Sequence, residues 1–265
     1  MIKLSSHTVK NHFWVGCLAL SLCMGCASSS HAQFTGKLSK NSKILVIGDS
    51  LTVGPFGDFM QEWLFSNLPQ SQIAIYAACG SSPEHWMSNK PEFISPCGYR
   101  ETTPSSKILT KYENGRKPVP TATPKIETLL MKFKPDVLIV QLGTNHFDTL
   151  EKDGDKAIPE LQKIYRQFSQ SIIANKGNLK MVYWITPPDA SKYPAHIKTK
   201  VQKIIGENNR NHGFRDFYSY EKIPYSKGLS GSDGVHLNKE ASRIWFSKVK
   251  VEFSKELRNR GLTLK

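Results

Sequence analysis

Cysteine is scarce in this chain of 265 residues, and most of it lies near the start. Three of the five cysteines precede residue 27, so the body of the chain keeps only Cys79 and Cys97. Two cysteines cannot form a paired-cysteine zinc site, and no His-Glu-x-x-His motif, phosphate-binding P-loop or dinucleotide fingerprint occurs. We therefore expect neither a metal ion nor a cofactor.

Long apolar runs are also missing. After residue 30 the chain has no apolar stretch of roughly 18 residues, so we expect no transmembrane helix in the body. No basic run alternates with aromatic residues, which argues against a nucleic-acid partner despite the net charge of +14. The hydrophobic fraction of 39% excludes a largely disordered chain, and the length fits one large α/β domain.

Residues 1–32 are typical of an export signal. Two lysines are the only charged residues there, and the run 13–27 is almost wholly apolar or small. Two processing sites compete. Ser30-His31-Ala32 suits a general signal peptidase, whereas Gly25-Cys26 resembles a lipoprotein site with Cys26 as the lipid acceptor. We expect an exported protein, periplasmic or secreted, with a membrane-anchored lipoprotein and an uncleaved N-terminal anchor as alternatives.

Export bears on the two remaining cysteines. In an oxidising compartment, two cysteines indicate one disulfide, here between Cys79 and Cys97. Two free, buried thiols remain the alternative, because the sequence does not supply the Cα separation that a bridge needs.

From residue 43 onward, short apolar runs alternate with amphipathic stretches. We expect buried strands at 43–48, 72–77, 136–142, 179–185 and 214–217. One helical face is formed by Phe56, Phe59, Met60, Trp63 and Leu64, and similar faces recur at 161–172, 197–205 and 245–257. This alternation predicts an α/β fold, a flavodoxin-like three-layer αβα sandwich with a central parallel sheet of about five strands. Functional residues should lie beyond the carboxyl ends of these strands.

One segment breaks the alternation. Residues 81–122 hold six prolines among many charged residues and show no sustained period. A stretch of that kind inside a compact domain is usually a functional loop or a disordered one. We therefore predict a single domain over 33–265 with an irregular insertion at 81–122.

Polar residues follow the expected strands. Ser50 follows the first strand, within Gly48-Asp49-Ser50-Leu51, where a serine taken alone is more often a helix N-cap than a nucleophile. Gly80 follows the second strand, Gly143-Thr144-Asn145-His146 follows the third, and Asp233-Gly234-Val235-His236 precedes the last helix. These four blocks, in this order, resemble the signature blocks of the SGNH hydrolases, also called GDSL-type esterases and lipases. The resemblance covers roughly residues 43–255.

The resemblance implies a role for each matching residue. Ser50 would be the nucleophile and its N–H the first oxyanion donor, with the N–H of Gly80 and the side-chain amide of Asn145 as the second and third. His236 would be the general base and Asp233 the acid that orients it, which suits their spacing of three residues. The sequence departs from the family where the third block usually ends in Asp, because His146 stands there.

The function expected from these residues is that of an exported serine esterase. It would form an acyl-Ser50 intermediate and remove O-acetyl groups from carbohydrate, with an acylated small molecule or a polysaccharide as its partner. Candidate substrate contacts are His146, Trp86 and Tyr99, with Tyr112 as a further ring in the insertion. The alternative is that these residues pack inside the protein, which is at least as common for the aromatic rings and more common for the histidine. A lipase or thioesterase for longer acyl chains and a non-catalytic carbohydrate-binding protein on the same fold remain alternatives.

Overall fold

The computed structural model describes residues 34–68, 73–111, 116–224 and 233–264. The predicted export signal, with Cys26, lies outside the described residues, as does Tyr112. Among the helices that are described, none combines the length and the apolar character needed to cross a membrane.

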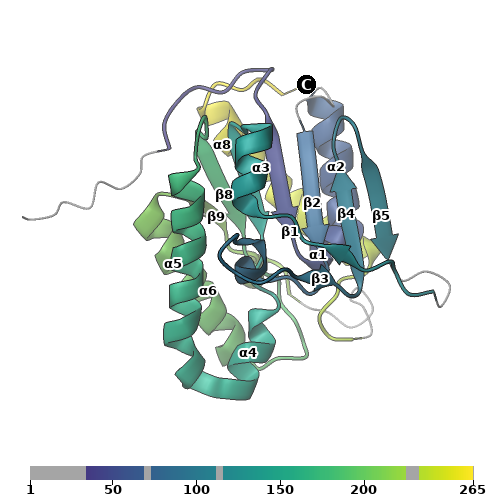
Figure 1. Ribbon diagram of the computed structural model, residues 1–265, viewed down its shortest axis with the longest axis vertical. Coiled ribbons are helices and arrows are strands. Elements are labelled where there is room, and N and C mark those ends of the chain that lie inside the picture. The colour runs from purple at the N-terminus through teal and green to yellow at the C-terminus, as the bar shows by residue number, and fades with distance from the viewer. Residues whose placement is uncertain (1–33, 69–72, 112–115, 225–232, 265) are drawn as a thin grey trace, which may run out of the picture. The chain divides into compact units, whose positions relative to one another are not determined.

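A seven-stranded sheet forms the centre of the domain, in the order β5-β4-β2-β1-β7-β8-β9 (Figure 1). Its strands are β1 (Ile44–Gly48), β2 (Ile73–Ala78), β4 (Gly98–Thr102), β5 (Lys107–Lys111), β7 (Val137–Gln141), β8 (Met181–Ile185) and β9 (Arg215–Phe217). The five strands expected from the sequence are all present, and they pair in parallel. The predicted fold class is thus confirmed.

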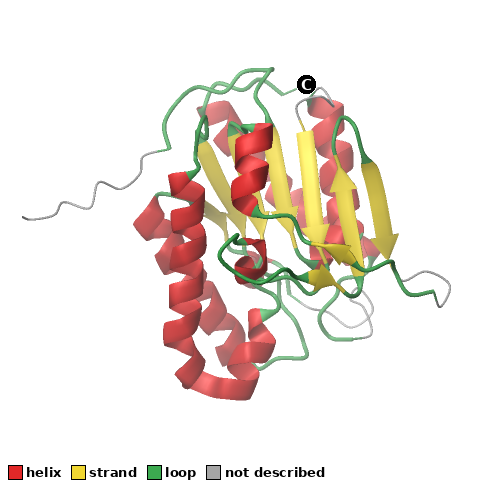
Figure 2. Ribbon diagram, viewed as in Figure 1, coloured by secondary structure: helices red, strands yellow, loops and turns green. Residues whose placement is uncertain are grey.

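The prediction of an irregular segment at 81–122 is wrong for its described residues, 81–111 and 116–122, because they contain strands. The segment adds β4 and β5, which pair antiparallel and extend the sheet beyond β2 (Figure 2). Further strands β3 (Ile94–Ser95) and β6 (Thr121–Ala122) form a separate two-stranded ribbon. The apolar pattern missed β4 and β5 because β4 reads Gly-Tyr-Arg-Glu-Thr, with a buried arginine, and the residues of β5 are mostly exposed.

Helices cover both faces of the sheet (Figure 1). On one face lie α2 (Pro55–Asn67) and α8 (Lys239–Asn259), and on the other α3 (Ile126–Phe133), α5 (Ile158–Ala174) and α6 (Ala195–His212). Shorter helices are α1 (Ser50–Val53), α4 (His146–Asp153), α7 (Ser219–Lys222) and the 3-10 helices η2 (Pro83–Trp86) and η3 (Gly154–Ala157). Ile44 and Val46 of β1 pack with α2 and α8, and Leu45 and Ile47 pack on the opposite face. Both faces of the strand are buried, which explains its continuous apolar run.

The register of the three central strands brings their carboxyl ends together. Gly48, the last residue of β1, pairs with Ala77 of β2 on one side and Gln141 of β7 on the other. The segments that follow these strands therefore leave the sheet at the same edge. Gly48 also permits α1 to fold back onto β1, because a Cβ at this position would lie 2.2 Å from Oγ1 of Thr52.

Candidate active site

Ser50 is the first residue of α1 and lies directly beyond the end of β1. The side chain of Asp49 caps this short helix by accepting the N–H of Leu51 at 3.0 Å. Oγ1 of Thr52 donates to Oε1 of Gln141 at 2.7 Å, which attaches the helix to the end of β7. The serine is thus fixed between two strand ends, on a rigid element.

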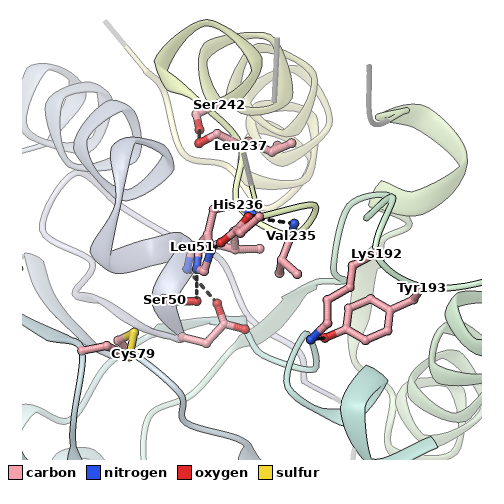
Figure 3. A network of polar contacts seen from close by, with 12 residues as sticks. Ser50, Leu51, Cys79, Lys192, Tyr193, Val235, His236, Leu237 and Ser242 are labelled. Carbon is pink, nitrogen blue, oxygen red and sulfur yellow. Dashed lines mark hydrogen bonds and ion pairs between the residues drawn. A yellow bond between two sulfur atoms is a disulfide. The ribbon is translucent and has the colours of Figure 1, made fainter. Parts of the chain in front are cut away.

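The expected base, His236, reaches Ser50 from a distant part of the chain. Nε2 of His236 lies 2.8 Å from Oγ of Ser50, although the two residues are 186 positions apart (Figure 3). Nδ1 of His236 lies 2.5 Å from Oδ2 of Asp233. Oδ1 of Asp233 accepts the backbone N–H groups of Val235 and His236, so one carboxylate shapes the whole turn. The turn precedes α8, whose first turn is capped by Asn238.

The charges suit a histidine base. Partial burial alone would raise the pKa of Asp233, but the hydrogen bonds from His236 and from two backbone N–H groups hold it below its usual value. Asp233 is therefore ionised at neutral pH and acts only as an acceptor. This requires a proton on Nδ1 of His236, which leaves Nε2 of the neutral ring to accept the proton of Ser50.

The expected oxyanion donors lie at the same edge of the sheet. Gly80 follows β2 and has φ +81°, a conformation that glycine adopts without strain. Among the described residues, neither its N–H nor that of Ser50 meets a hydrogen-bond acceptor. Nδ2 of Asn145 donates to the carbonyl oxygen of Ser81 at 2.8 Å, so the third expected donor is attached to the residue after Gly80. The oxyanion role of these groups remains a prediction.

Cys79 and Cys97 form a disulfide, with their Cα atoms 5.3 Å apart. The bridge connects the residue before Gly80 with the residue before β4. Oγ of Ser95 lies within hydrogen-bond distance of the carbonyl oxygens of Cys79 and Gly98, at 2.9 and 2.6 Å. The insertion is thus covalently attached beside an expected oxyanion donor.

The three predicted substrate contacts are not at the surface. His146, Trp86 and Tyr99 are exposed by only 1%, 0% and 3%. Each is a hydrogen-bonded interior residue. Trp86 donates to Oγ of Ser81 at 3.1 Å and the hydroxyl of Tyr99 to Oε2 of Glu101, also at 3.1 Å. A ring that is closed off in this way cannot stack on a sugar, so these residues have the packing role that the sequence analysis gave as the alternative to substrate contact.

Three further residues shape the site and were missed in the sequence. Burial raises the pKa of Asp49 from 3.8 to about 6, so this helix cap is a buried acid beneath Ser50. Arg100 of β4 contacts the far end of α1, and Glu84 contacts His146. Arg100 and Glu84 act across contacts between distant segments, for which a single sequence carries no signal. Asp49 could have been noticed as an acid at the end of a fully buried strand.

A family model for GDSL-like lipases and acylhydrolases matches residues 44–249, which include Ser50, Asn145 and His236. The chain belongs to this family, the SGNH hydrolases. Membership implies an enzyme that hydrolyses ester bonds. No curated protein sequence matches the chain.

Solved structures share the fold. A structure of TesA is similar with a TM-score of 0.53 at 14% identity, covering 80% of this chain and 98% of that one. A catalytic mutant of Axe2, an acetylxylan esterase from Geobacillus stearothermophilus, gives 0.52 at 12% identity, covering 86% and 97%. The psychrotrophic esterase EstA from Pseudoalteromonas sp. gives 0.51 at 16% identity, covering 82% and 99%. Identities this low establish the shared fold alone.

Proposed function

We propose that the protein is a serine esterase with Ser50 as its nucleophile, and that it removes O-acetyl groups from carbohydrate. The observation that carries the proposal is the continuous chain of contacts from Oγ of Ser50 through His236 to Asp233, at 2.8 and 2.5 Å. A weak hydroxyl nucleophile becomes reactive when a base in this position takes its proton.

The reaction follows from these positions. Oγ of Ser50 attacks the ester carbonyl carbon as Nε2 of His236 takes the hydroxyl proton. The oxyanion that forms faces the N–H groups of Ser50 and Gly80 and the amide of Asn145. When the bond to the leaving alcohol breaks, His236 returns the proton to that oxygen and acyl-Ser50 remains. Water then attacks the acyl carbon with His236 again as base, which releases the acid and restores Ser50.

Two features support an acetylated, bulky substrate. The side chains of His236 and Asp233 are 45% and 51% exposed, so the base is accessible to a large leaving group. One of the structures with this fold is named an acetylxylan esterase, and the structural match includes 97% of that chain.

The test compares p-nitrophenyl acetate with longer p-nitrophenyl esters, using Ser50→Ala and His236→Ala as inactive variants. His196→Ala is the matched control, because His196 is an exposed residue of α6. Acetate release from a panel of acetylated glycans then identifies the substrate. Faster hydrolysis of long-chain esters would favour a lipase or thioesterase. Full activity in Ser50→Ala would refute the covalent mechanism, and an inactive wild type that still binds glycans would indicate a binding protein.

We further propose that the protein is exported, and that residues 1–32 are its signal. The support is the sequence pattern of two lysines, an apolar centre and small residues. Mass spectrometry of the protein expressed with its full chain tests this. A new N-terminus after Ala32 indicates a periplasmic or secreted enzyme, a lipid on Cys26 indicates an anchored one, and an intact residue 1 on cytoplasmic protein would refute export.

A further inference from the structure

Two side-chain contacts connect the segment that carries Gly80 with the segment that carries Asn145. The first is the hydrogen bond from Asn145 to the carbonyl oxygen of Ser81. The second joins Glu84 in η2 to His146, the first residue of α4, with 3.2 Å between Oε2 and Nε2. Glu84 lies shortly after Gly80, and His146 directly follows Asn145. The second contact therefore spans the two segments beside both expected donors.

The ring of His146 is held from both sides. Its Nδ1 lies 2.9 Å from the hydroxyl of Tyr165 on α5, and the residue is 1% exposed. Burial alone would raise the pKa of Glu84, but the hydrogen bond and charge of His146 hold it below its usual value. Glu84 is thus ionised at neutral pH and can only accept, so Nε2 of His146 must carry a proton. The orientation of the ring is fixed by these two partners.

The identity of residue 146 fits its partner. Where this chain has His146, the SGNH blocks usually have Asp. A carboxylate at this position would face the ionised Glu84, and two like charges at such a distance repel. The imidazole of His146 avoids this repulsion and supplies an N–H donor to Glu84 instead.

We propose that Glu84 and His146 form a positioning pair that holds the N–H of Gly80 and the amide of Asn145 at the separation that the developing oxyanion requires. The proposal rests on the proposed esterase function. His146 is buried, so the pair acts through the donors rather than by binding substrate. Donors aimed at charge that develops in the transition state contribute to kcat more than to KM. A displacement of about 1 Å can lower the rate on the order of 100-fold.

The test measures kcat and KM separately for p-nitrophenyl acetate in four single variants and in the double variant Glu84→Gln/His146→Leu. Glu84→Gln keeps the shape but removes the charge, and His146→Leu removes both ring contacts. His146→Gln restores an N–H donor toward Glu84 and should recover part of the loss. Glu127→Gln is the matched control, because Glu127 also holds the insertion, through the N–H of Ser88 at 3.1 Å, but away from the donors.

We expect kcat to fall about tenfold in Glu84→Gln and further in His146→Leu, with KM within about twofold of wild type. The fold-loss of kcat in the double variant should be smaller than the product of the two single fold-losses, because both substitutions act on the same contact. Glu127→Gln should keep wild-type values. An unchanged kcat in Glu84→Gln, or a raised KM with unchanged kcat, would overturn the proposal.

A second readout separates this proposal from the proposed function. Hydrogen exchange of the peptide that spans 78–87 reports on the same segment without any substrate. We expect faster exchange in His146→Leu than in wild type and Glu127→Gln. If the wild type hydrolyses no ester, the proposed function fails, and unchanged exchange would then overturn the positioning pair as well.

Discussion

Nη2 of Arg100 donates to the carbonyl oxygen of Val53 at 2.9 Å, which places a charged side chain of β4 at the last residue of the helix that begins with Ser50. Arg100 is only 2% exposed, and its guanidinium also contacts Gln61 and Asp58 of α2. The insertion thus supports α1, the helix that carries the proposed nucleophile, and it also adjoins the segment of Gly80, an expected oxyanion donor.

Replacing this arginine should destabilise the nucleophile helix. Arg100→Met leaves the carbonyl oxygen of Val53 buried without its donor, so we expect a loss of about 1–3 kcal/mol in the free energy of unfolding and a lower kcat. Urea denaturation and p-nitrophenyl acetate kinetics measure both. Asp58→Asn is the control. Its side chain is 52% exposed, and the asparagine keeps an amide oxygen that can accept from Arg100, so this variant should lose less than Arg100→Met. Equal losses in both variants would mean that the ion pair, and not the carbonyl contact, is what matters.

Removing the charge of Asp233 should damage the base without unfolding the turn. Asp233→Asn keeps an oxygen for the N–H groups of Val235 and His236, but its amide cannot hold His236 in the required tautomer. We expect kcat to fall by at least about 100-fold with little change in melting temperature. Glu240→Gln is the control, because Glu240 is an exposed acid in the first turn of α8 that pairs with Arg243. Wild-type turnover in Asp233→Asn would exclude an orienting role for this carboxylate.

Asp49 should make stability depend on pH in a direction that is unusual for an acid. Burial raises its pKa in the folded protein from 3.8 to about 6, so between these values the folded state holds a proton that the unfolded state releases. The contribution of Asp49 to the free energy of unfolding is therefore fully present below about pH 4. As the pH rises through about 6, the free energy of unfolding falls by roughly 3 kcal/mol in total.

Asp49→Asn removes this dependence. Its free energy of unfolding, relative to wild type, should improve by roughly 3 kcal/mol between about pH 4 and pH 8. Urea denaturation of both proteins at the two pH values measures the change. A difference between the two proteins that does not vary with pH would show that Asp49 does not titrate in this range.

The disulfide should affect turnover as well as stability. Breaking the bridge that closes this loop should lower the free energy of unfolding by on the order of 3 kcal/mol by the chain-entropy model. Because Cys79 precedes Gly80, we expect reduced protein and Cys97→Ser to stay folded below their melting temperature yet turn over more slowly. The double variant Cys79→Ser/Cys97→Ser should not respond to a reductant. Unchanged kinetics would make the bridge purely structural.

Four of the five parallel strands were predictable because they are almost wholly buried and read as nearly unbroken apolar runs, as Ile44–Gly48 does. The fifth, β9, reads Arg-Asp-Phe and is buried only at Phe217, so its signal in the sequence is weaker. The blocks at the strand ends were predictable because the sheet fixes where a residue after a strand must lie. The strands of the insertion were not, because β4 contains a charged residue that is buried only through its partners on α1 and α2.

Long-range contacts set the limit of the sequence analysis. His146, Trp86 and Tyr99 have the chemistry of ligand contacts, and only the packing of α5, η2 and β4 around them shows that they are interior residues. The residue type indicates what a side chain is able to bind. It does not indicate whether the side chain faces solvent.

The contact between Ser50 and His236 also has a consequence for folding. The two residues are 186 positions apart, so a partly folded domain that has formed β1 to β8 holds Ser50 but not its expected base. We therefore expect ester hydrolysis to begin only once the turn at Asp233 and helix α8 have joined the domain.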